Sequence, residues 1–221
     1  MTELNAFIFD CDGVLLDSIG AWHSLDAQLA EEAGIELTVE DRNTLNASTL
    51  DEAAEFFHVR YGVGESADDV NQRFTDILLD YYRNRAAEVP GALAFVRAAH
   101  DAGAPMCVLS SSPKAFLQAG LGRAGFLDYI DCVLSVEELP FKKRDGRLYP
   151  YVCDKLGVAL GNTWMFDDSK YAIRTAHEVG IRCVGVFSDE HCGTHEQLGA
   201  FSERVIDSFE GLDIADFLAQ S

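Results

Sequence analysis

The chain has 221 residues, 48% of them apolar, and a formal net charge of −20. A chain of this size and composition can bury a substantial core, which excludes a disordered or fibrous protein. The excess of acidic residues disfavours nucleic acid and anionic membranes as partners, because the surface as a whole repels polyanions. A phosphorylated ligand would therefore need a local source of attraction, such as a metal ion, a lysine or a helix N-terminus.

Six cysteines are scattered along the chain without Cys-X-X-Cys spacing, and several lie in apolar, strand-like runs. This pattern favours reduced, mostly packed thiols over a disulfide framework or a zinc site. No apolar run is long enough to cross a bilayer, and the N-terminal stretch has no basic region ahead of its apolar residues. We therefore expect a soluble, cytoplasmic protein.

The predicted elements alternate between strand and helix over most of the chain. Short runs rich in β-branched and aromatic residues predict buried strands at Ala6–Phe9, Pro105–Leu109, Tyr129–Leu134, Thr163–Phe166 and Cys183–Phe187. Segments with helical spacing, each followed closely by a glycine, lie between them at Ala92–Asp101, Phe116–Ala124, Tyr149–Leu156 and Tyr171–Val179. This alternation predicts an α/β fold in which helices cover both faces of a parallel sheet.

One long segment breaks the alternation, because it offers helical patterns without a convincing strand. Trp22–Glu32, Asp51–Tyr61 and Asp68–Asn84 have the spacing of amphipathic helices, with glycine turn signals between them. We therefore expect an inserted helical domain of residues 18–87 in a core made of residues 1–17 and 88–221.

The first predicted strand ends in a pair of acidic residues. In the sequence FIFDCDGVLLDS, Asp10 closes the apolar run, and Asp12 and Gly13 follow. Ligands of parallel sheets bind beyond the carboxyl ends of the strands. A turn aided by Gly13 could bring both carboxylates into one crevice, where one attacks and the other transfers a proton. A merely polar turn explains this motif equally well when it is taken alone.

The second predicted strand is followed by hydroxyl side chains. In MCVLSSSPK, Ser110 ends the strand, while Ser112 and Pro113 have the character of an N-cap and a first helical residue. The free backbone N–H groups at such a helix start would form an anion site. Capping accounts for Ser112 and Pro113, but it does not require the hydroxyls of Ser110 and Ser111.

The third segment is basic. The sequence ELPFKKRDGRLYPYVCDKLGV places basic residues directly ahead of a helix, where a lysine could neutralise a phosphoryl group. Solvated surface lysines are the more common explanation of such a run.

The fourth segment carries two adjacent aspartates. In TWMFDDSKYA, another apolar strand is followed by Asp167 and Asp168 side by side. Adjacent carboxylates repel one another unless they share a cation, and such hard ligands suit Mg²⁺. Helix capping is the alternative role of these aspartates.

The ordered set of segments supplies a nucleophile, a metal site, an anion cradle and a counter-charge together. With DCDGVLLDS, VLSSSP, KRDGRLYPYVCDKLGV, MFDDS and VIDS, the chain resembles the haloacid dehalogenase-like hydrolases over nearly its whole length. In particular, the chain resembles the subgroup with a helical cap that includes phosphoglycolate phosphatases and β-phosphoglucomutase. It implies a Rossmann-like core, a cap domain that closes over the site, and Mg²⁺-dependent phosphatase activity on a small phosphorylated metabolite.

The resemblance also implies a role for each acidic residue. Asp10 would be the nucleophile, and Asp12 would be the general acid for the leaving group and then the base for water. The carboxylates of Asp10 and Asp168 and the carbonyl of Asp12 would hold Mg²⁺, with Asp167 as a ligand or directly behind the ligands.

The remaining implied roles concern the phosphoryl group. Ser110 and the amide of Ser111 would bind its oxygens, and a lysine would neutralise its charge. Lys143 is the expected lysine because it precedes Tyr149 by six residues, as in the family. An arginine replaces the usual proline after it, which leaves Lys142 as the alternative.

Other functions are weighed by particular residues. A dehalogenase of the same superfamily would leave Asp12 and the pair Asp167 and Asp168 without a role, and a phosphonate hydrolase would need a cap lysine, which residues 18–87 lack. A sugar phosphomutase keeps the whole catalytic set, but Trp22 and Thr49 occupy the cap positions of the histidine and arginine expected in β-phosphoglucomutase. A catalytically idle binding or regulatory member is the remaining alternative.

The substrate itself is not indicated by any single motif. The cap residues that could contact it are Trp22, His23, Asn46, Ser48 and Thr49. We expect a monomer or homodimer that has no nucleic-acid or membrane partner.

Overall fold

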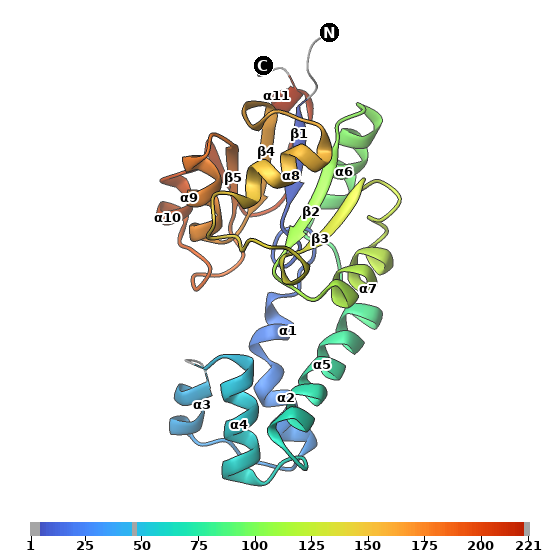
Figure 1. Cartoon of the computed structure of the whole chain (residues 1–221). Helices are drawn as coiled ribbons and strands as arrows, with labels where there is room; N and C mark the ends of the chain where they lie inside the picture. Colours follow the sequence, from blue (N-terminus) through green and yellow to red (C-terminus); the bar gives the residue numbers. More distant parts are fainter. Residues whose placement is uncertain (1–4, 46–47, 219–221) are drawn as a thin grey trace. The chain divides into compact units, whose positions relative to one another are not determined.

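The computed structural model describes residues 5–45 and 48–218, which form two compact units (Figure 1). One unit takes in the described chain up to Ile19 and from Ala86 onward, and the other is Gly20–Arg85. We call them the sheet unit and the helical unit and describe each by itself. Asn46, one of the candidate substrate contacts, lies outside the described residues.

The described residues of the sheet unit form a six-stranded parallel sheet in the order β3-β2-β1-β4-β5-β6. The strands are β1 (Ala6–Phe9), β2 (Met106–Ser110), β3 (Cys132–Ser135), β4 (Thr163–Asp167), β5 (Arg182–Val186) and β6 (Arg204–Ile206). The chain winds from β1 to one edge and then from β4 to the other, as in Rossmann-like folds. The predicted α/β class with a Rossmann-like parallel sheet is confirmed.

Helices follow the strands of this unit in sequence and pack against the sheet. They are α6 (Ala92–Asp101), α7 (Lys114–Ala124), α8 (Leu148–Leu156), α9 (Lys170–Glu178), α10 (His195–Gly199) and α11 (Ala215–Leu218). Two short 3-10 helices, Val136–Glu138 and Leu160–Asn162, lie in the connections around α8.

Strand β1 is buried on both faces because alternate side chains enter two different cores. Phe7 and Phe9 point into an aromatic cluster with Phe95 of α6, completed by Phe166, Phe209 and Phe217. Ile8 points to the opposite face, where its apolar cluster includes Tyr149 of α8 and Ile173 of α9. The central strand is therefore held from both sides, and its last residue has a fixed position.

The helical unit consists of α1 (Ile19–His23), α2 (Leu25–Glu32), α3 (Val39–Leu45), α4 (Leu50–Tyr61) and α5 (Ala67–Asn84), with Ile19 at its border. Helix α4 begins with a capping box in which Thr49 and Glu52 satisfy one another's backbone N–H groups. Helices α4 and α5 meet through Phe57 and Phe74, whose ring centroids are 6.0 Å apart.

A buried carboxylate also ties this unit together. Asp41 is 1% exposed and accepts hydrogen bonds from the Thr38 amide and hydroxyl, from the Tyr61 hydroxyl and, as an ion pair at 2.8 Å, from Arg60. Because these donors come from both ends of the segment from α3 to α4, Asp41 fixes the two helices to each other.

Two predicted elements differ most from the structure, and the ends of several others differ by one or two residues. Strand β3 begins three residues later than expected, because Tyr129 lies in a turn and its ring packs against His100 and Arg97. The single helix expected at Trp22–Glu32 is divided into α1 and α2 at Ser24, whose hydroxyl bonds the Ala21 carbonyl.

No helix in the described part of the chain is long and apolar enough to cross a membrane.

Candidate active site

The acidic motifs meet where β1 and β4 end side by side. Phe9 pairs with Phe166 in the sheet register, so the next residues, Asp10 and Asp167, are neighbours. The Asp10 amide also donates to the Phe166 carbonyl at 2.8 Å. The winding direction of the chain reverses between these strands, and the carboxyl ends of strands at such a point are where α/β sheets bind their ligands.

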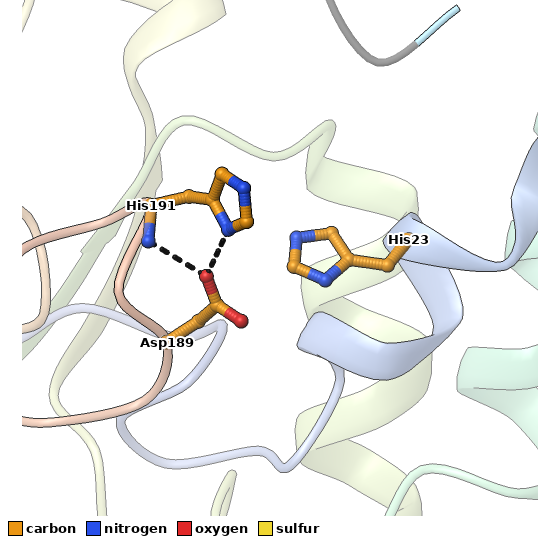
Figure 2. Close-up of side chains that lie close together, drawn as sticks. All are labelled: His23, Asp189 and His191. Atoms are coloured by element: carbon orange, nitrogen blue, oxygen red, sulfur yellow. Dashed lines mark hydrogen bonds and ion pairs between the residues drawn. The ribbon is translucent and has the colours of Figure 1, made fainter. Parts of the chain in front are cut away.

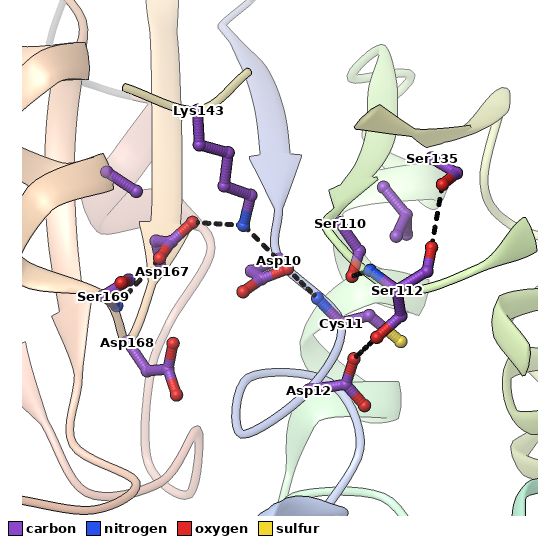
Figure 3. A network of polar contacts seen from close by, with 12 residues as sticks. Asp10, Cys11, Asp12, Ser110, Ser112, Ser135, Lys143, Asp167, Asp168 and Ser169 are labelled. Atoms are coloured by element: carbon purple, nitrogen blue, oxygen red, sulfur yellow. Dashed lines mark hydrogen bonds and ion pairs between the residues drawn. The ribbon is translucent and has the colours of Figure 1, made fainter. Parts of the chain in front are cut away.

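Lys143 is enclosed between the two carboxylates. Its Nζ lies 2.8 Å from Asp10 Oδ1 and 2.8 Å from Asp167 Oδ2 (Figure 3). Lys143 is 3% exposed, Asp10 is 7% exposed and Asp167 is fully buried. Asp10 Oδ1 also accepts the Cys11 amide at 2.8 Å.

The neighbouring lysine has a different environment. Lys142 is exposed, and its Nζ donates to the Val136 carbonyl at 2.9 Å. Lys143 is directed inward because the Tyr149 hydroxyl donates to its backbone carbonyl at 2.9 Å. The six-residue spacing to Tyr149 therefore corresponds to a physical contact, and it is Lys143 that reaches the aspartates.

Asp168 completes a group of three carboxylates. One oxygen from each of Asp10, Asp167 and Asp168 lies within 4.8 Å of the others. Asp167 Oδ1 accepts the Ser169 amide at 2.8 Å, and Asp168 Oδ2 accepts the Ser188 hydroxyl at 2.5 Å. Three ionised carboxylates and one ammonium leave an excess of two negative charges, so these residues form a candidate site for a divalent cation.

The shortage of positive charge is reflected in the pKa values of these groups. Burial raises the pKa of the Asp10 carboxyl, Lys143 opposes the rise, and Asp167 adds to it. Burial and the neighbouring Asp10 likewise raise the pKa of Asp168. Burial alone would lower the pKa of Lys143, but Asp10 and Asp167 together raise it well above its ordinary value. The lysine therefore stays protonated while the carboxylates compete for positive charge.

Gly13 is required by the turn that follows Asp10. Its φ is +73°, and a Cβ at this position would lie 2.6 Å from Asp168 Oδ2 and 2.7 Å from Ser188 Cβ. Only glycine combines this left-handed conformation with so close an approach. The turn expected at Gly13 thus brings the β1 loop against the loop that follows β4.

Asp12 points away from Asp167, toward the hydroxyl side chains (Figure 3). Its Oδ1 accepts the Ser18 hydroxyl at 2.5 Å and its Oδ2 accepts the Ser112 hydroxyl at 2.6 Å. The two carboxylates of the first motif therefore have different surroundings: Asp10 faces a lysine, and Asp12 is held by two neutral donors.

The serine loop after β2 folds on itself. The Ser112 amide donates to Ser110 Oγ at 3.1 Å, and the Ser135 hydroxyl donates to the Ser112 carbonyl at 2.8 Å. Ser110 is buried and Ser111 is exposed. The N-cap role expected for Ser112 is wrong: helix α7 begins at Lys114 after Pro113, and the Ser112 hydroxyl bonds Asp12 instead.

Two more serines belong to this network: Ser18, the last residue of the first motif, for which no role was expected, and Ser188, which lies outside the motifs discussed above. Ser18 bonds Asp12 of the same motif, six residues earlier, whereas Ser188 bonds Asp168, which lies 20 residues earlier in the chain. No periodicity or capping pattern marks such pairs, so the sequence alone offers no signal for them.

The loop after β5 also carries Asp189 and His191. The His191 amide donates to Asp189 Oδ1 at 2.7 Å, and the imidazole Nδ1 bonds the same oxygen at 2.5 Å (Figure 2). His23, drawn in the same view, belongs to the helical unit, and we assign no site to this group.

A family model described as haloacid dehalogenase-like hydrolase matches residues 7–186, which include all of the carboxylates above. The chain belongs to the haloacid dehalogenase-like hydrolases. The resemblance stated from the motifs is thereby confirmed.

Individual relatives in this family are distant. The chain is 25% identical to validoxylamine A 7'-phosphate phosphatase of Streptomyces hygroscopicus subsp. limoneus, covering 81% of this chain and 84% of that protein. It is 24% identical to 6-phosphogluconate phosphatase of Escherichia coli K12, covering 86% of both. It is 27% identical to SUPPRESSOR OF QUENCHING 1 of Arabidopsis thaliana, covering 83% of this chain but 18% of that much longer protein.

A solved structure described as a putative β-phosphoglucomutase from Thermotoga maritima has the same fold. The TM-score is 0.79 at 20% identity, and the comparison covers 98% of this chain and 97% of the other. At this identity the likeness concerns the fold alone.

Proposed function

We propose that this haloacid dehalogenase-like hydrolase is a Mg²⁺-dependent phosphatase that hydrolyses a small phosphorylated metabolite through an aspartyl phosphate on Asp10. The observation that carries the proposal is the position of Asp10, at the end of the central strand, against Lys143 and within 4.8 Å of two more carboxylates. Relatives along most of the chain bear phosphatase names, which supports a phosphatase-type function.

The donor set fits a magnesium ion. Three carboxylates converge, two of them from the same β4 end, and their excess negative charge is only partly balanced by Lys143. Hard oxygen ligands of this kind suit Mg²⁺, which usually keeps several waters and takes one or two carboxylates plus substrate phosphate. Asp10 and Asp168 would hold the ion, with the carbonyl of Asp12, while Asp167 is engaged by Lys143. When bound, the ion would add charge stabilisation at the phosphoryl oxygens.

The first chemical step uses Asp10 and Lys143. A carboxylate oxygen of Asp10 forms a bond to phosphorus as the bond from phosphorus to the leaving oxygen breaks. The Lys143 ammonium, held at 2.8 Å from Asp10, stabilises the negative charge on the phosphoryl oxygens. Splitting hydrolysis into transfer to Asp10 and release to water replaces one difficult step by two easier ones.

Asp12 is proposed to act as the general acid in the first step and as the general base in the second. It protonates the leaving oxygen in the first step, and as a carboxylate it takes a proton from the water that attacks the aspartyl phosphate in the second. Ser18 and Ser112 fix the orientation of this carboxyl by donating to its two oxygens. Ser110 and the amide of Ser111 are proposed to bind the phosphoryl oxygens, from the loop that also supplies Ser112.

The test is detection of the acyl phosphate. Rapid acid quench of the protein with a phosphorylated substrate should leave phosphate on Asp10, identified by peptide mass spectrometry. Asp10→Asn should lose both the adduct and turnover, while Asp12→Ala should slow alkyl phosphates more than activated aryl phosphates, whose departure needs less protonation. Steady turnover by Asp10→Asn, with no phosphate on the wild-type residue, would refute the proposed nucleophile.

A phosphomutase is separated from a phosphatase by its product. The cap positions that differ from β-phosphoglucomutase have internal roles in this chain: Trp22 Nε1 donates to the Tyr82 hydroxyl at 2.9 Å, and Thr49 is the N-cap of α4. Both observations favour water as the final acceptor. With a sugar phosphate as substrate, inorganic phosphate should appear faster than an isomerised sugar phosphate, and the reverse order would overturn the phosphatase assignment.

A further inference from the structure

A pocket of about 450 Å³ lies at the end of the sheet opposite to the aspartates. Its lining includes Asp131 and Cys132 at the start of β3, and His100 and Lys155 from α6 and α8. Because all strands run parallel, these residues are at the amino ends of the strands, and the pocket is separate from the candidate active site. The pocket gives small molecules access to the Cys132 thiol.

That thiol has a second cysteine beside it. Cys132 on the edge strand β3 is the register partner of Cys107 on β2. Adjacent strands are about 4.8 Å apart, which lies inside the range of Cα separations that a disulfide can bridge. Both residues belong to the same apolar cluster, so their side chains share one face of the sheet. Cys107 is fully buried, whereas Cys132 is partly exposed and lines the pocket.

The two thiols are chemically unequal. The neighbouring Cys107 thiol lowers the pKa of Cys132, burial and Asp131 oppose this, and the Lys155 ammonium adds to it. The neighbouring Cys132 and burial raise the pKa of Cys107 well above its ordinary value, and the Cys107 thiol donates to the Val108 carbonyl at 3.2 Å. An accessible thiol of lowered pKa next to a buried thiol of raised pKa is the arrangement of a reactive cysteine with a resolving partner.

We propose that Cys132 is a thiol-modification site for small hydroperoxides that enter this pocket, and that Cys107 resolves the oxidised product. In the first step, the Cys132 thiolate attacks one peroxide oxygen. The O–O bond breaks, the sulfur becomes a sulfenic acid, and the other oxygen leaves as water or an alcohol after taking a proton. In the second step, the Cys107 sulfur forms a bond to the Cys132 sulfur, and the sulfenic oxygen leaves as water with the Cys107 proton.

The remaining cysteines provide internal controls. Cys192 is also partly exposed, but it does not line this pocket, and it lies outside the strands, so it has no register partner among them. Cys11, Cys153 and Cys183 are buried. Because the thiolate is the nucleophile and Cys132 lines a pocket beside a second thiol, Cys132 should react with peroxide at least about tenfold faster than Cys192.

The test uses the full chain in its reduced form, treated with stoichiometric hydrogen peroxide near neutral pH and then alkylated. Peptide mass spectrometry should find a disulfide between Cys107 and Cys132. In Cys107→Ser, no disulfide should form, and a dimedone-type probe should trap a sulfenic acid on Cys132. In Cys132→Ser, Cys107 should remain reduced.

Each other outcome counts against the proposal. Oxidation of Cys192 at a rate equal to or above that of Cys132 would show that the pocket confers no reactivity. A disulfide from Cys132 to Cys153 would remove Cys107 as the resolving thiol. Because the decisive comparison is made within the wild-type protein, it stands even where a serine variant folds poorly. Phosphatase activity is not part of the readout, so the result is independent of the proposed function.

Discussion

Replacing Lys143 by methionine removes the single ammonium between Asp10 and Asp167 while keeping much of the side-chain volume. Both ion pairs are 2.8 Å long and the lysine is 3% exposed, so its loss leaves two buried carboxylates facing each other. Removing one partner of a buried ion pair costs about 3–5 kcal/mol. At this chain length, 1 kcal/mol corresponds to about 2–4 °C, so the melting temperature of the sheet unit should fall by roughly 6–20 °C.

The Lys143→Met variant should also lose turnover, and by more than the loss of folded protein alone would cause. Loss of one preorganised electrostatic donor typically lowers kcat by about 10²–10³-fold, and Lys143 is the proposed donor to the phosphoryl group. Calorimetry and steady-state release of phosphate measure the two effects separately. Excess Mg²⁺ should restore part of the melting temperature of the variant, because the ion supplies positive charge to the same carboxylates.

Lys142→Met is the matched control. Lys142 is exposed and its Nζ bonds a backbone carbonyl, so this change should alter stability by less than about 0.5 kcal/mol and leave kcat near the wild-type value. A larger loss of turnover for Lys142→Met than for Lys143→Met would refute the assignment of the lysine.

Three other perturbations test the remaining parts of the argument. Asp168→Ala should weaken Mg²⁺ binding in calorimetric titration more than Asp167→Ala, since Asp167 is already engaged by Lys143; the opposite ranking would contradict this division of roles. Gly13→Ala puts an alanine in a left-handed conformation, which costs about 1–2 kcal/mol, and places its Cβ 2.6 Å from Asp168 Oδ2. The variant should therefore still fold but lose most of its activity, and an unchanged kcat would contradict the role given to this turn. In the helical unit, hydrogen bonds from Tyr61 and Thr38 lower the pKa of Asp41 to about 2, whereas the ordinary pKa of an aspartate is near 4. The ionised Asp41 therefore stabilises the folded state fully at pH values above about 4, and this stabilisation is lost as the pH falls from about 4 to 2. The difference in melting temperature between wild type and Asp41→Asn should therefore shrink over that interval, and a constant difference would exclude the mechanism.

The fold class followed from the sequence because the strands of a doubly covered parallel sheet are continuous apolar runs. The AFIF run was predicted to be a strand and is β1 with the same bounds, since all four of its residues are buried. Where a run was not buried throughout, its end was misplaced: Tyr129 is aromatic, but it packs against α6 and not in the sheet. β6 was expected only through the resemblance of VIDS to the family, because its three residues are half-buried and carry little pattern of their own.

In the candidate site, too, the residues that end strands could be predicted from the sequence, whereas the contacts made by loop residues could not. Asp10 and Asp167 each follow a buried strand, and the register of β1 with β4 makes them neighbours, so their meeting is a consequence of the fold. The hydroxyls that hold the other two carboxylates have no such origin. Ser112 lies 100 residues from Asp12 in sequence, and it gives up the N-cap position that its type and place predict in order to bond that carboxylate. The capping preference fails at Ser112 because the Asp12 carboxylate competes with the helix backbone for the same hydroxyl, and a carboxylate forms the stronger, charge-assisted hydrogen bond. A serine in this position that does not cap the helix is the kind of local exception that marks a functional site, because Ser112 orients the Asp12 carboxylate instead of satisfying the backbone of α7.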